Sequence, residues 1–497
     1  MNDNLDVSPG SSRAGNFDEP VIFYKSVSGR KGSSLPETGV PKANPGDIFD
    51  SEMIRTDDAL LPELSEPDVV RHFTRLSTWN FGIDHGFYPL GSCTMKYNPK
   101  INEEVARFKG FTALHPYTAV KNAQGAIKLM VEFENMLAEI SGMSAITLQP
   151  AAGAHGELTA LMAIRAALTK RGDPRKKVLI PDTAHGTNPA SSALNGYVVE
   201  QIASTKEGLL SVESLREKMD ENVAALMLTN PNTLGLFEKD IVEICKIVHE
   251  KGGFVFGDGA NLNAIMGKAR PGDFGIDAMQ FNLHKTFSTP HGGGGPGSGP
   301  VGVCAELEPF LPGPRPYKKK DNTYSYRITG DSIGRVRSFY GNFGVIVKAY
   351  TYILEMGADG LKEASEMAVL NANYLLNLIK DHYYIPYGNG RCMHEVVASD
   401  KNLLDETGIS TLDVAKGLID RGFHPPTIYF PLIVKGALMC EPTETESKET
   451  IEEFADAMIE IAKLAKTDPE SLHNLPLTTR VSKLDEAAAA RKPILKA

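Results

Sequence analysis

The sequence FNLHKTFSTPHGGGG, residues 281–295, is the most informative stretch of this 497-residue chain. Its lysine, Lys285, stands between His284 and Thr286, after an apolar run and before a glycine-rich turn. A buried lysine amine can form a Schiff base with a carbonyl compound, and glycines let the backbone approach a bulky planar molecule. The stretch therefore predicts a lysine that holds pyridoxal 5'-phosphate (PLP), although His-Lys-Thr alone is also common in surface loops.

Short apolar segments alternate with helical patterns on both sides of this stretch. Such alternation is typical of an α/β fold, in which a mostly parallel sheet is covered by helices on both faces. Ligands of such sheets bind beyond the carboxyl ends of the strands, where the polar motifs of this chain occur. The predicted strands are residues 145–148, 178–180, 223–228, 254–256, 278–281 and 301–304.

Asp258 follows one of these predicted strands and lies 27 residues before Lys285. A carboxylate at a strand end, one strand before the lysine, can pair with the pyridinium nitrogen of PLP and make the ring an electron sink. Asp258-Gly259 is also an ordinary turn sequence. The spacing to Lys285 favours the role at the cofactor.

The sequence LQPAAGAHGE, residues 148–157, links the first predicted strand to a helix. Small residues at a helix N-terminus expose backbone N–H groups, which bind phosphate. We therefore expect Ala152, Gly153 and Ala154 to contact the cofactor phosphate. His155 is placed to stack on the pyridine ring; the alternative is a helix-end histidine without a specific role.

Polar side chains follow two further predicted strands, in residues 182–189 and 229–233. Their hydroxyl, amide and ring nitrogen groups can bind the cofactor or the substrate. From these segments we predict His185, Thr187 and Thr229 as cofactor contacts, and His284 beside the lysine as another. Asn232 in Asn-Pro-Asn is better explained as a turn residue.

The glycine-rich residues 292–299 do not fit a nucleotide site. They lack the Lys-Ser/Thr of a P-loop and do not connect a strand to a helix, so neither ATP nor NAD is expected. Farther along, Arg335 and Arg337 can hold a carboxylate bidentately, but a surface salt bridge explains either arginine equally well.

Composition narrows the class of protein. Apolar residues make up 42% and charged residues 23%, as in soluble globular enzymes. The net charge of −10 argues against nucleic-acid binding. The 5 cysteines form no CxxC pair, which favours a reduced compartment and no metal site built on cysteine. With no secretory or transit signal in residues 1–16 and no apolar run of ~20 residues, we expect a cytoplasmic protein without a membrane span.

The chain is expected to divide into four parts. Residues 1–51 are rich in Gly, Pro and Ser and predict an extended arm, and a capped helix follows through Phe73. Helical periodicity also marks residues 124–140, 345–381 and 447–464, and candidate strands occupy 388–399 and 427–434. The predicted parts are an N-terminal arm and helix (1–85), a large PLP-binding domain (86–344), a smaller C-terminal α/β domain (345–475) and a tail (476–497).

These motifs together resemble the P-proteins of the glycine cleavage system, and the resemblance runs across nearly the whole chain. It is carried by YPLGSCTMKYNP (88–99), the 149–157 loop, AHGTNPAS (184–191), DGAN (258–261), residues 283–299, GRVRSFYGNFG (334–344), CMHE (392–395) and EPTETES (441–447).

The resemblance implies a fold-type I PLP enzyme with Lys285 as the lysine that bears the cofactor. It implies decarboxylation of glycine, release of CO2 and transfer of the aminomethyl group to the lipoyl arm of H-protein. Because the chain contains only the lysine-bearing half of a P-protein, it resembles the catalytic subunit, paired with P-protein subunit 1 as an α2β2 heterotetramer. The segment 89–96 is expected to reach over the site as a lid.

Two alternatives remain from the residues themselves. Another fold-type I enzyme, such as an amino acid decarboxylase, a serine hydroxymethyltransferase or a cysteine desulfurase, would share Lys285 and Asp258. A desulfurase needs a nucleophilic cysteine, for which Cys93 is the candidate. A scaffold subunit without activity would have no reason to combine the lysine, the carboxylate and the phosphate-binding turn.

Overall fold

The computed structural model describes residues 19–57 and 59–494. The chain divides into two compact units, Gly86–Lys483 and a smaller one made of Met1–His85 with Leu484–Ala497. The larger unit contains every residue that the sequence analysis assigned to a site.

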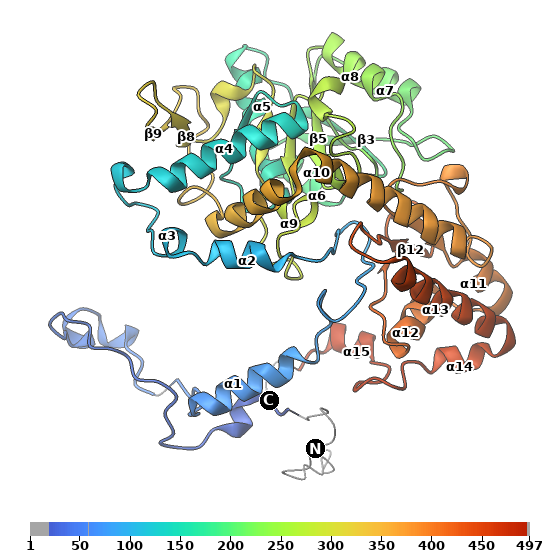
Figure 1. Ribbon diagram of the computed structural model, residues 1–497, viewed down its shortest axis with the longest axis horizontal. Helices are drawn as coiled ribbons and strands as arrows, with labels where there is room; N and C mark the ends of the chain where they lie inside the picture. The colour runs from blue at the N-terminus through green and yellow to red at the C-terminus, as the bar shows by residue number, and fades with distance from the viewer. Residues whose placement is uncertain (1–18, 58, 495–497) are drawn as a thin grey trace. The chain divides into compact units, whose positions relative to one another are not determined.

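A seven-stranded sheet forms the centre of the larger unit, with the strand order β1-β7-β6-β5-β4-β2-β3 (Figure 1). All neighbouring strands are parallel except β7, which runs antiparallel to both β1 and β6. The predicted α/β fold with a mainly parallel sheet is therefore confirmed. The strands are β1 (Ala145–Thr147), β2 (Lys177–Pro181), β3 (Val198–Ile202), β4 (Val223–Thr229), β5 (Phe254–Gly259), β6 (Ala278–Phe281) and β7 (Val301–Val303).

Strand β3 was not predicted, because it lies at the edge of the sheet and is half polar. Val198 is 67% exposed there, whereas every residue of the central strand β4 is buried. Continuous burial on both faces is what gives a parallel strand its uninterrupted apolar sequence. An edge strand with the sequence VVEQI lacks that signal.

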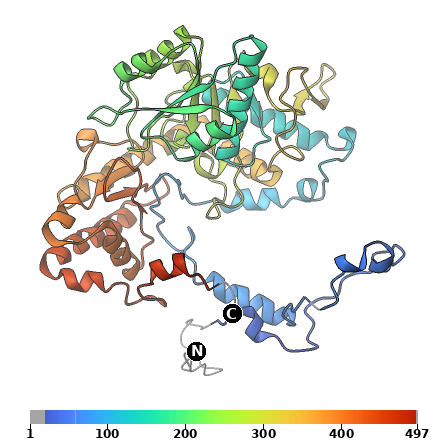
Figure 2. The ribbon, with the colours of Figure 1, turned by 180° about the vertical axis from the view of Figure 1, so that it is seen from behind.

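Helices cover both faces of the sheet. Helices α4 (Gln124–Ser141), α8 (Ile241–Glu250) and the first part of α10 (Phe343–Ile379) pack on one face. Helix α5 (Gly153–Lys170) covers the other face, seen from behind in Figure 2. The predicted helix at 124–140 is confirmed. Shorter helices are α2 (Lys100–Ala106), α3 (Lys109–Thr112), α6 (Thr187–Leu194), α7 (Val212–Lys218) and α9 (Leu283–Thr286), and a hairpin joins β8 (Arg315–Lys318) to β9 (Tyr324–Arg327).

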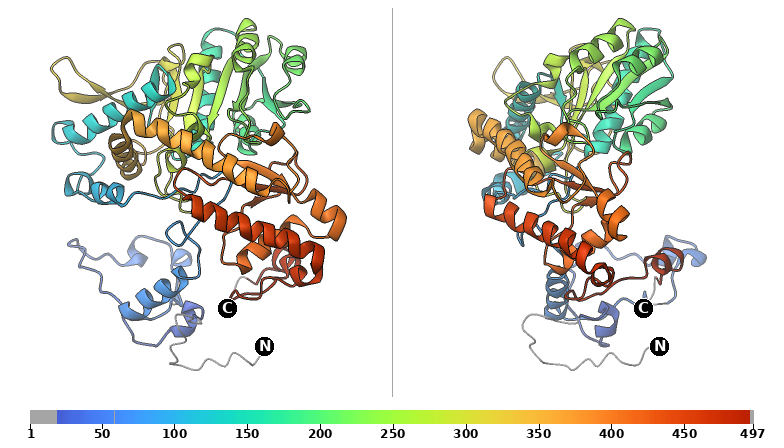
Figure 3. Two further views of the ribbon diagram at one scale, coloured as in Figure 1. Left: turned by 45° about the vertical axis from the view of Figure 1, so that its right-hand side comes forward. Right: turned by 90° about the vertical axis from the view of Figure 1, so that its right-hand side faces the viewer.

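A second hydrophobic core occupies the C-terminal part of this unit. Helix α10 continues into it past Gly357, which has φ 61°, and runs beside α13 (Lys448–Thr467), as Figure 3 shows. Its sheet is antiparallel, in the order β10-β12-β11. The remaining elements are β10 (Val396–Ser399), β11 (Thr427–Ile428), β12 (Ala437–Cys440), α11 (Lys401–Thr407), α12 (Thr411–Asp420) and α14 (Pro469–His473).

The strand predictions in this part were only partly right. The predicted strand at 427–434 shortens to Thr427–Ile428, because Pro431 lies in a turn that ends the pairing. Strand β12 was missed although all four residues are buried. Its sequence, ALMC, contains no β-branched or aromatic residue, so β propensity gives no indication of it.

The smaller unit contains α1 (Glu66–Ser77), which begins at a capping box formed by Ser65 and Asp68, and α15 (Glu486–Arg491). Residues 19–57 form only three short 3-10 turns, at Ile22–Lys25, Pro45–Asp47 and Ser51–Met53. The first part of the predicted arm, residues 1–18, lies outside the described residues. Among the helices described, none combines the length and the apolarity that crossing a membrane requires.

Candidate active site

The parallel register places three polar residues side by side at the carboxyl end of the sheet. Thr229 of β4 is paired with Asp258 of β5, which is paired with Gln280 of β6. Asp258 is 5% exposed and accepts hydrogen bonds from Gln280 Nε2 (2.5 Å), from the Ala260 N–H (3.0 Å) and from Asn188 Nδ2 (3.3 Å). These three donors hold the carboxylate in one orientation.

Gln280 also connects Asp258 to the helix that carries Lys285. Asn282, the residue before α9, donates from Nδ2 to Gln280 Oε1 at 2.7 Å. The sequence analysis missed both amides. A polar glutamine inside the otherwise apolar strand AMQF was the available signal, because a buried amide needs partners.

A second buried carboxylate, Glu157 of α5, lies close to Asp258. Burial, and then the charge of Asp258, raise the pKa of Glu157 to about 7. Glu157 accepts hydrogen bonds from the hydroxyls of Thr187 (2.7 Å) and Ser191 (3.1 Å), and His185 Nδ1 lies 2.9 Å from Thr187 Oγ1. Among the described residues, the hydrogen-bond donors to these two carboxylates are hydroxyls, side-chain amides and one backbone N–H, and not lysine or arginine. The pair therefore suits a cation supplied by a ligand.

The first turn of α5 is open toward the same edge of the sheet. Ala152 precedes the helix, no side chain caps it, and the Ala152 carbonyl accepts the N–H of Gly156 (2.9 Å). The first N–H groups of a helix have no partner within it, so those of Gly153 and Ala154 can bind an anion. A Cβ atom on Gly299 would lie 2.0 Å from the Ala152 carbonyl oxygen, so this glycine allows two backbone segments to touch.

His155 lies in this first turn and is half-buried. Its Nδ1 accepts the N–H of Ala151 at 3.1 Å. Burial, and then the charge of Arg337, lower the pKa of His155. Arg337 itself is bonded to Asn342, whose Nδ2 donates to the Ala151 carbonyl at 3.2 Å. The ring is thus neutral and fixed by the backbone.

Lys285 lies on α9, directly after β6, and is half-buried. Its Nζ donates to the carbonyl of Ser92 at 2.7 Å. Within residues 19–57 and 59–494, Nδ1 of the neighbouring His284 has no hydrogen-bond partner, and the buried hydroxyls of Thr229 and Ser298 have none either. The pKa of His284 falls to about 3 because of burial and then the charge of Lys285. Buried polar atoms without partners are rare in proteins and suit a polar ligand such as a phosphorylated cofactor.

The sequence analysis assigned the close backbone approach to the glycine-rich turn as a whole, but its glycines differ in conformation and burial. Gly292, Gly293 and Gly294 have φ between 60° and 101° and are exposed. The close approach is made instead by Gly297, where a Cβ atom would lie 2.5 Å from His284 Nδ1, and by Gly299. The first three glycines therefore serve the turn itself.

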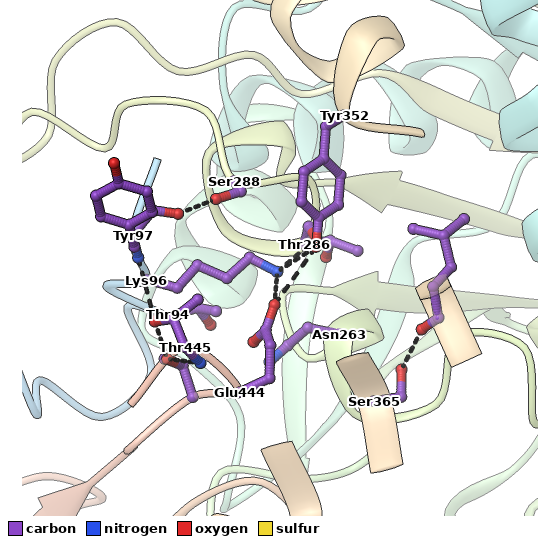
Figure 4. Close-up of polar contacts among 12 residues, drawn as sticks. Thr94, Lys96, Tyr97, Asn263, Thr286, Ser288, Tyr352, Ser365, Glu444 and Thr445 are labelled. Carbon is purple, nitrogen blue, oxygen red and sulfur yellow. Dashed lines mark hydrogen bonds and ion pairs between the residues drawn. The ribbon is translucent and has the colours of Figure 1, made fainter. Parts of the chain in front are cut away.

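The segment 89–96, expected as a lid, contacts Lys285 through the carbonyl of Ser92, and buried contacts hold it in place; its role as a lid remains a prediction. Lys96 Nζ donates to Glu444 Oε1 (2.7 Å), to the carbonyl of Thr286 (2.9 Å) and to the Tyr352 hydroxyl (3.5 Å), as Figure 4 shows. Burial opposes the charge of Lys96, but Glu444 and Tyr352 more than compensate and its pKa lies above the usual value. Lys96 thus ties this segment to α9, to α10 and to the loop after β12.

The same segment contacts two acidic residues of the C-terminal part. The N–H of Ser92 donates to Glu395 Oε2 (2.9 Å), and the N–H of Thr94 donates to Glu441 Oε2 (3.0 Å). Both glutamates lie in motifs, 392–395 and 441–447, to which the sequence analysis gave no role. They could not be assigned from the sequence because the partners lie more than 300 residues apart.

A lysine directly after a parallel strand, a carboxylate one strand away and a helix N-terminus at the same sheet edge are the arrangement typical of the fold of fold-type I PLP-dependent enzymes. The overall fold agrees. A crystal structure of glycine decarboxylase (P-protein) of the glycine cleavage system, in inhibitor-bound form, superposes with TM-score 0.71 at 18% identity, over 84% of this chain and 94% of that one. A cysteine desulfurase from Thermococcus onnurineus gives TM-score 0.60 at 17% identity, over 76% and 95%.

Sequence comparison identifies the family. The sequence model of the family "glycine cleavage system P-protein" matches residues 41–322, and the family model of the glycine dehydrogenase C-terminal domain matches residues 364–474. A "probable glycine dehydrogenase (decarboxylating) subunit 2" from Listeria monocytogenes is 58% identical over 96% of this chain and 98% of its own length. A protein of the same name from Thermotoga maritima is 56% identical over 96% and 99%. The chain belongs to the P-protein family of the glycine cleavage system.

Proposed function

We propose that this chain is the PLP-bearing catalytic subunit of a glycine dehydrogenase (decarboxylating). It releases CO2 from glycine and transfers the aminomethyl group to the lipoyl arm of H-protein. The observation that carries the proposal is the convergence of Lys285, Asp258 and the N-terminus of α5 at one sheet edge, in a chain whose close relatives bear that name.

The polar groups of the site divide into those for the ring and those for the phosphate. Lys285 carries the cofactor, and Asp258, held by Gln280, keeps a positive charge on the ring nitrogen. The bound cofactor supplies an electron sink for the electrons left when CO2 departs. His155, whose neutral imidazole is fixed by the backbone, would stack on the ring. Ala152, Gly153 and Ala154 would hold the phosphate, and Thr187, His185, Thr229 and His284 would complete the cofactor contacts.

A desulfurase reaction is disfavoured by the state of Cys93. Burial raises the pKa of this thiol, with the charge of Lys285 as a smaller opposing effect. The thiolate is the nucleophilic form of cysteine, so a raised pKa makes Cys93 a poor nucleophile at neutral pH.

The partners are a P-protein subunit 1, with which the chain forms an α2β2 heterotetramer, and lipoylated H-protein. Support comes from the name of the relatives, "subunit 2", and from large apolar side chains exposed on the N-terminal arm. Tyr24 is 70% exposed, Leu35 93% and Met53 75%, which is costly unless another protein covers them. We also propose domain boundaries at residues 85, 344 and 475. The five unpaired cysteines support a cytoplasmic location.

Two measurements test the function. Borohydride reduction of the PLP-loaded chain, followed by peptide mapping, should place the pyridoxyl group on Lys285, and Lys285→Arg should abolish the label while the exposed control Lys268→Arg keeps it. Glycine–bicarbonate exchange should then require this chain together with subunit 1. Label on another lysine would refute the site, and exchange by the isolated monomer would refute the assembly.

A further inference from the structure

The antiparallel register of the C-terminal sheet brings two glutamates together beside Lys285. Val396 of β10 is paired with Cys440 of β12. Glu395 directly precedes the first of these residues and Glu441 directly follows the second, so the two carboxylates lie opposite each other at the end of the sheet. Both side chains are fully buried. Two like charges placed opposite each other across a ladder destabilise the sheet.

The protein supplies hydrogen bonds to these carboxylates but no cation in contact with them. Glu441 accepts the Thr94 hydroxyl (2.7 Å) and N–H (3.0 Å) and the amide of Asn263 (3.2 Å). Glu395 accepts the Ser92 N–H through Oε2, whereas its Oε1 has no hydrogen-bond partner among the residues described. Neither glutamate forms an ion pair with a lysine or arginine in residues 19–57 and 59–494.

A third buried side chain points into the pair. His394 is fully buried, and neither ring nitrogen has a hydrogen-bond partner in the part of the chain that the structure describes. Its Nε2 lies 3.9 Å from Glu395 Oε1 and 3.9 Å from Glu441 Oε1. One atom from each of the three residues lies within 4.8 Å of the others. Such an arrangement of acceptors is unfavourable unless at least one proton lies between them.

The charged groups around the cluster determine whether it holds a proton or a metal ion. Lys285 acts on it from α9, Cys93 from the segment 89–96 and His394 from the turn before β10, while Asn263 contributes only a neutral amide. Burial lowers the pKa of His394 to about 3 and raises that of Cys93, so both are neutral at pH 7. Lys285 is therefore the only positive group among them.

Burial raises the pKa of Glu441 to about 7, and burial together with the charge of Glu441 raises the pKa of Glu395 well above its usual value. These directions agree with the geometry, because two adjacent carboxylates without a bound cation cannot both ionise readily.

We propose that Glu395 and Glu441 share one proton and that this pair, with neutral His394 beside it, is the proton-holding counter-charge of Lys285. One shared proton leaves one negative charge, which balances one lysine ammonium. The second carboxylate then accepts the proton that Lys285 must lose to become a nucleophilic amine. In that step an N–H bond breaks and an O–H bond forms, and the net charge of the cluster stays the same.

A proton fits this cluster better than a divalent metal ion. Glu441 Oε1, which faces His394, already accepts the Thr94 hydroxyl and the amide of Asn263, and these bonds use the lone pairs that a metal would need at that atom. A divalent ion would also place two positive charges next to Lys285 and leave the buried cluster with a net positive charge. The proposal deepens the proposed function, because it concerns the lysine that carries the cofactor, but its test requires neither cofactor nor substrate.

The first test is infrared spectroscopy of the full chain at pH 7. A shared proton predicts one protonated-carboxyl band that disappears in both Glu395→Gln and Glu441→Gln. Glu134→Gln is the matched control: burial raises the pKa of this remote glutamate of α4 to about 8, so its substitution should remove a different band. Glutamate labelled with ¹³C gives the number of protonated carboxyls in the unsubstituted chain, whether or not the variants fold. A band that survives either substitution, or no band assignable to the pair, overturns the proposal.

The second test measures the pKa of Lys285 directly, by competitive labelling with acetic anhydride over a pH series and mass spectrometry of its peptide. Because glutamine mimics the neutral acid, each single variant should change this pKa little. The double variant Glu395→Gln/Glu441→Gln removes the negative charge and should lower it by about one unit or more. An unchanged pKa in the double variant, or a stoichiometric divalent metal that Glu441→Gln removes, overturns the proposal. Failure of these tests would leave the borohydride label on Lys285 unaffected, so the two proposals can be judged separately.

Discussion

Replacing Lys96 by methionine should strongly destabilise the larger unit. At the 2.7 Å distance between Lys96 Nζ and Glu444 Oε1, Coulomb attraction amounts to about 6 kcal/mol at an effective dielectric constant of 20. The side chain of Lys96 is 1% exposed and that of Glu444 10%, so solvent cannot replace the lost partner. Removing one partner of such a buried pair typically costs about 3–5 kcal/mol. The carbonyl of Thr286 would lose its donor as well.

Urea unfolding followed by circular dichroism measures this loss. The control is Lys128→Met, because Lys128 pairs with Glu132 at 3.6 Å on the surface of α4, with 55% and 38% of the side chains exposed. That pair is worth only about 0.3–0.5 kcal/mol. The double variant Lys96→Met/Glu444→Leu removes both buried charges and should recover much of the loss. A cost below about 1 kcal/mol for Lys96→Met, or a double variant as unstable as the single one, would refute this reasoning.

Three other changes have defined outcomes. Asp258→Asn should retain PLP but slow glycine–bicarbonate exchange by roughly two orders of magnitude, because the charge on the ring nitrogen is lost; near-normal exchange would contradict the role. Gly299→Ala should cost about 1–3 kcal/mol in urea unfolding and weaken PLP binding, since its Cβ meets the carbonyl of Ala152, whereas Gly125→Ala in α4 meets nothing within 4 Å and should be neutral or slightly stabilising. Burial opposes ionisation of Glu19, but hydrogen bonds from basic side chains prevail and lower its pKa to about 2; the stabilisation it gives is complete above about pH 4.5 and should fade as the pH falls toward 2, and Glu19→Gln should remove this part of the pH dependence of unfolding.

The large sheet could be predicted because its information is local. Strands β4 and β5 each begin with an apolar run, and Asp258 follows that of β5 after a single glycine, so strand and carboxylate are recognised together. Lys285 follows β6 in the same way. The roles of these residues toward the cofactor remain predictions.

The rest of the site depends on contacts that no local pattern encodes. Thr94 donates to Glu441 across 347 residues, and Lys96 donates to Glu444 across 348. The acidic motif 441–447 has the sequence of a solvated loop. It becomes buried because β12, whose sequence has no β propensity, lies beside the segment 89–96, where Leu90 pairs with Cys440. Asn188 was missed for a related reason, since Asn-Pro indicates a turn whether or not the amide holds a carboxylate.

Because β12 must pair with β10 to bring Glu395 and Glu441 together, the acidic residues near Lys285 are assembled late during synthesis. A chain grows at roughly 5–20 residues per second, so Lys285 is made on the order of ten to thirty seconds before Glu441. During that interval the central strands are already available for folding, while the acidic pair beside the lysine is incomplete, because Glu441 is synthesised after Glu395. A nascent chain that ends before β12 therefore lacks Glu441, and the acidic pair beside the amine is complete only when β12 pairs with β10.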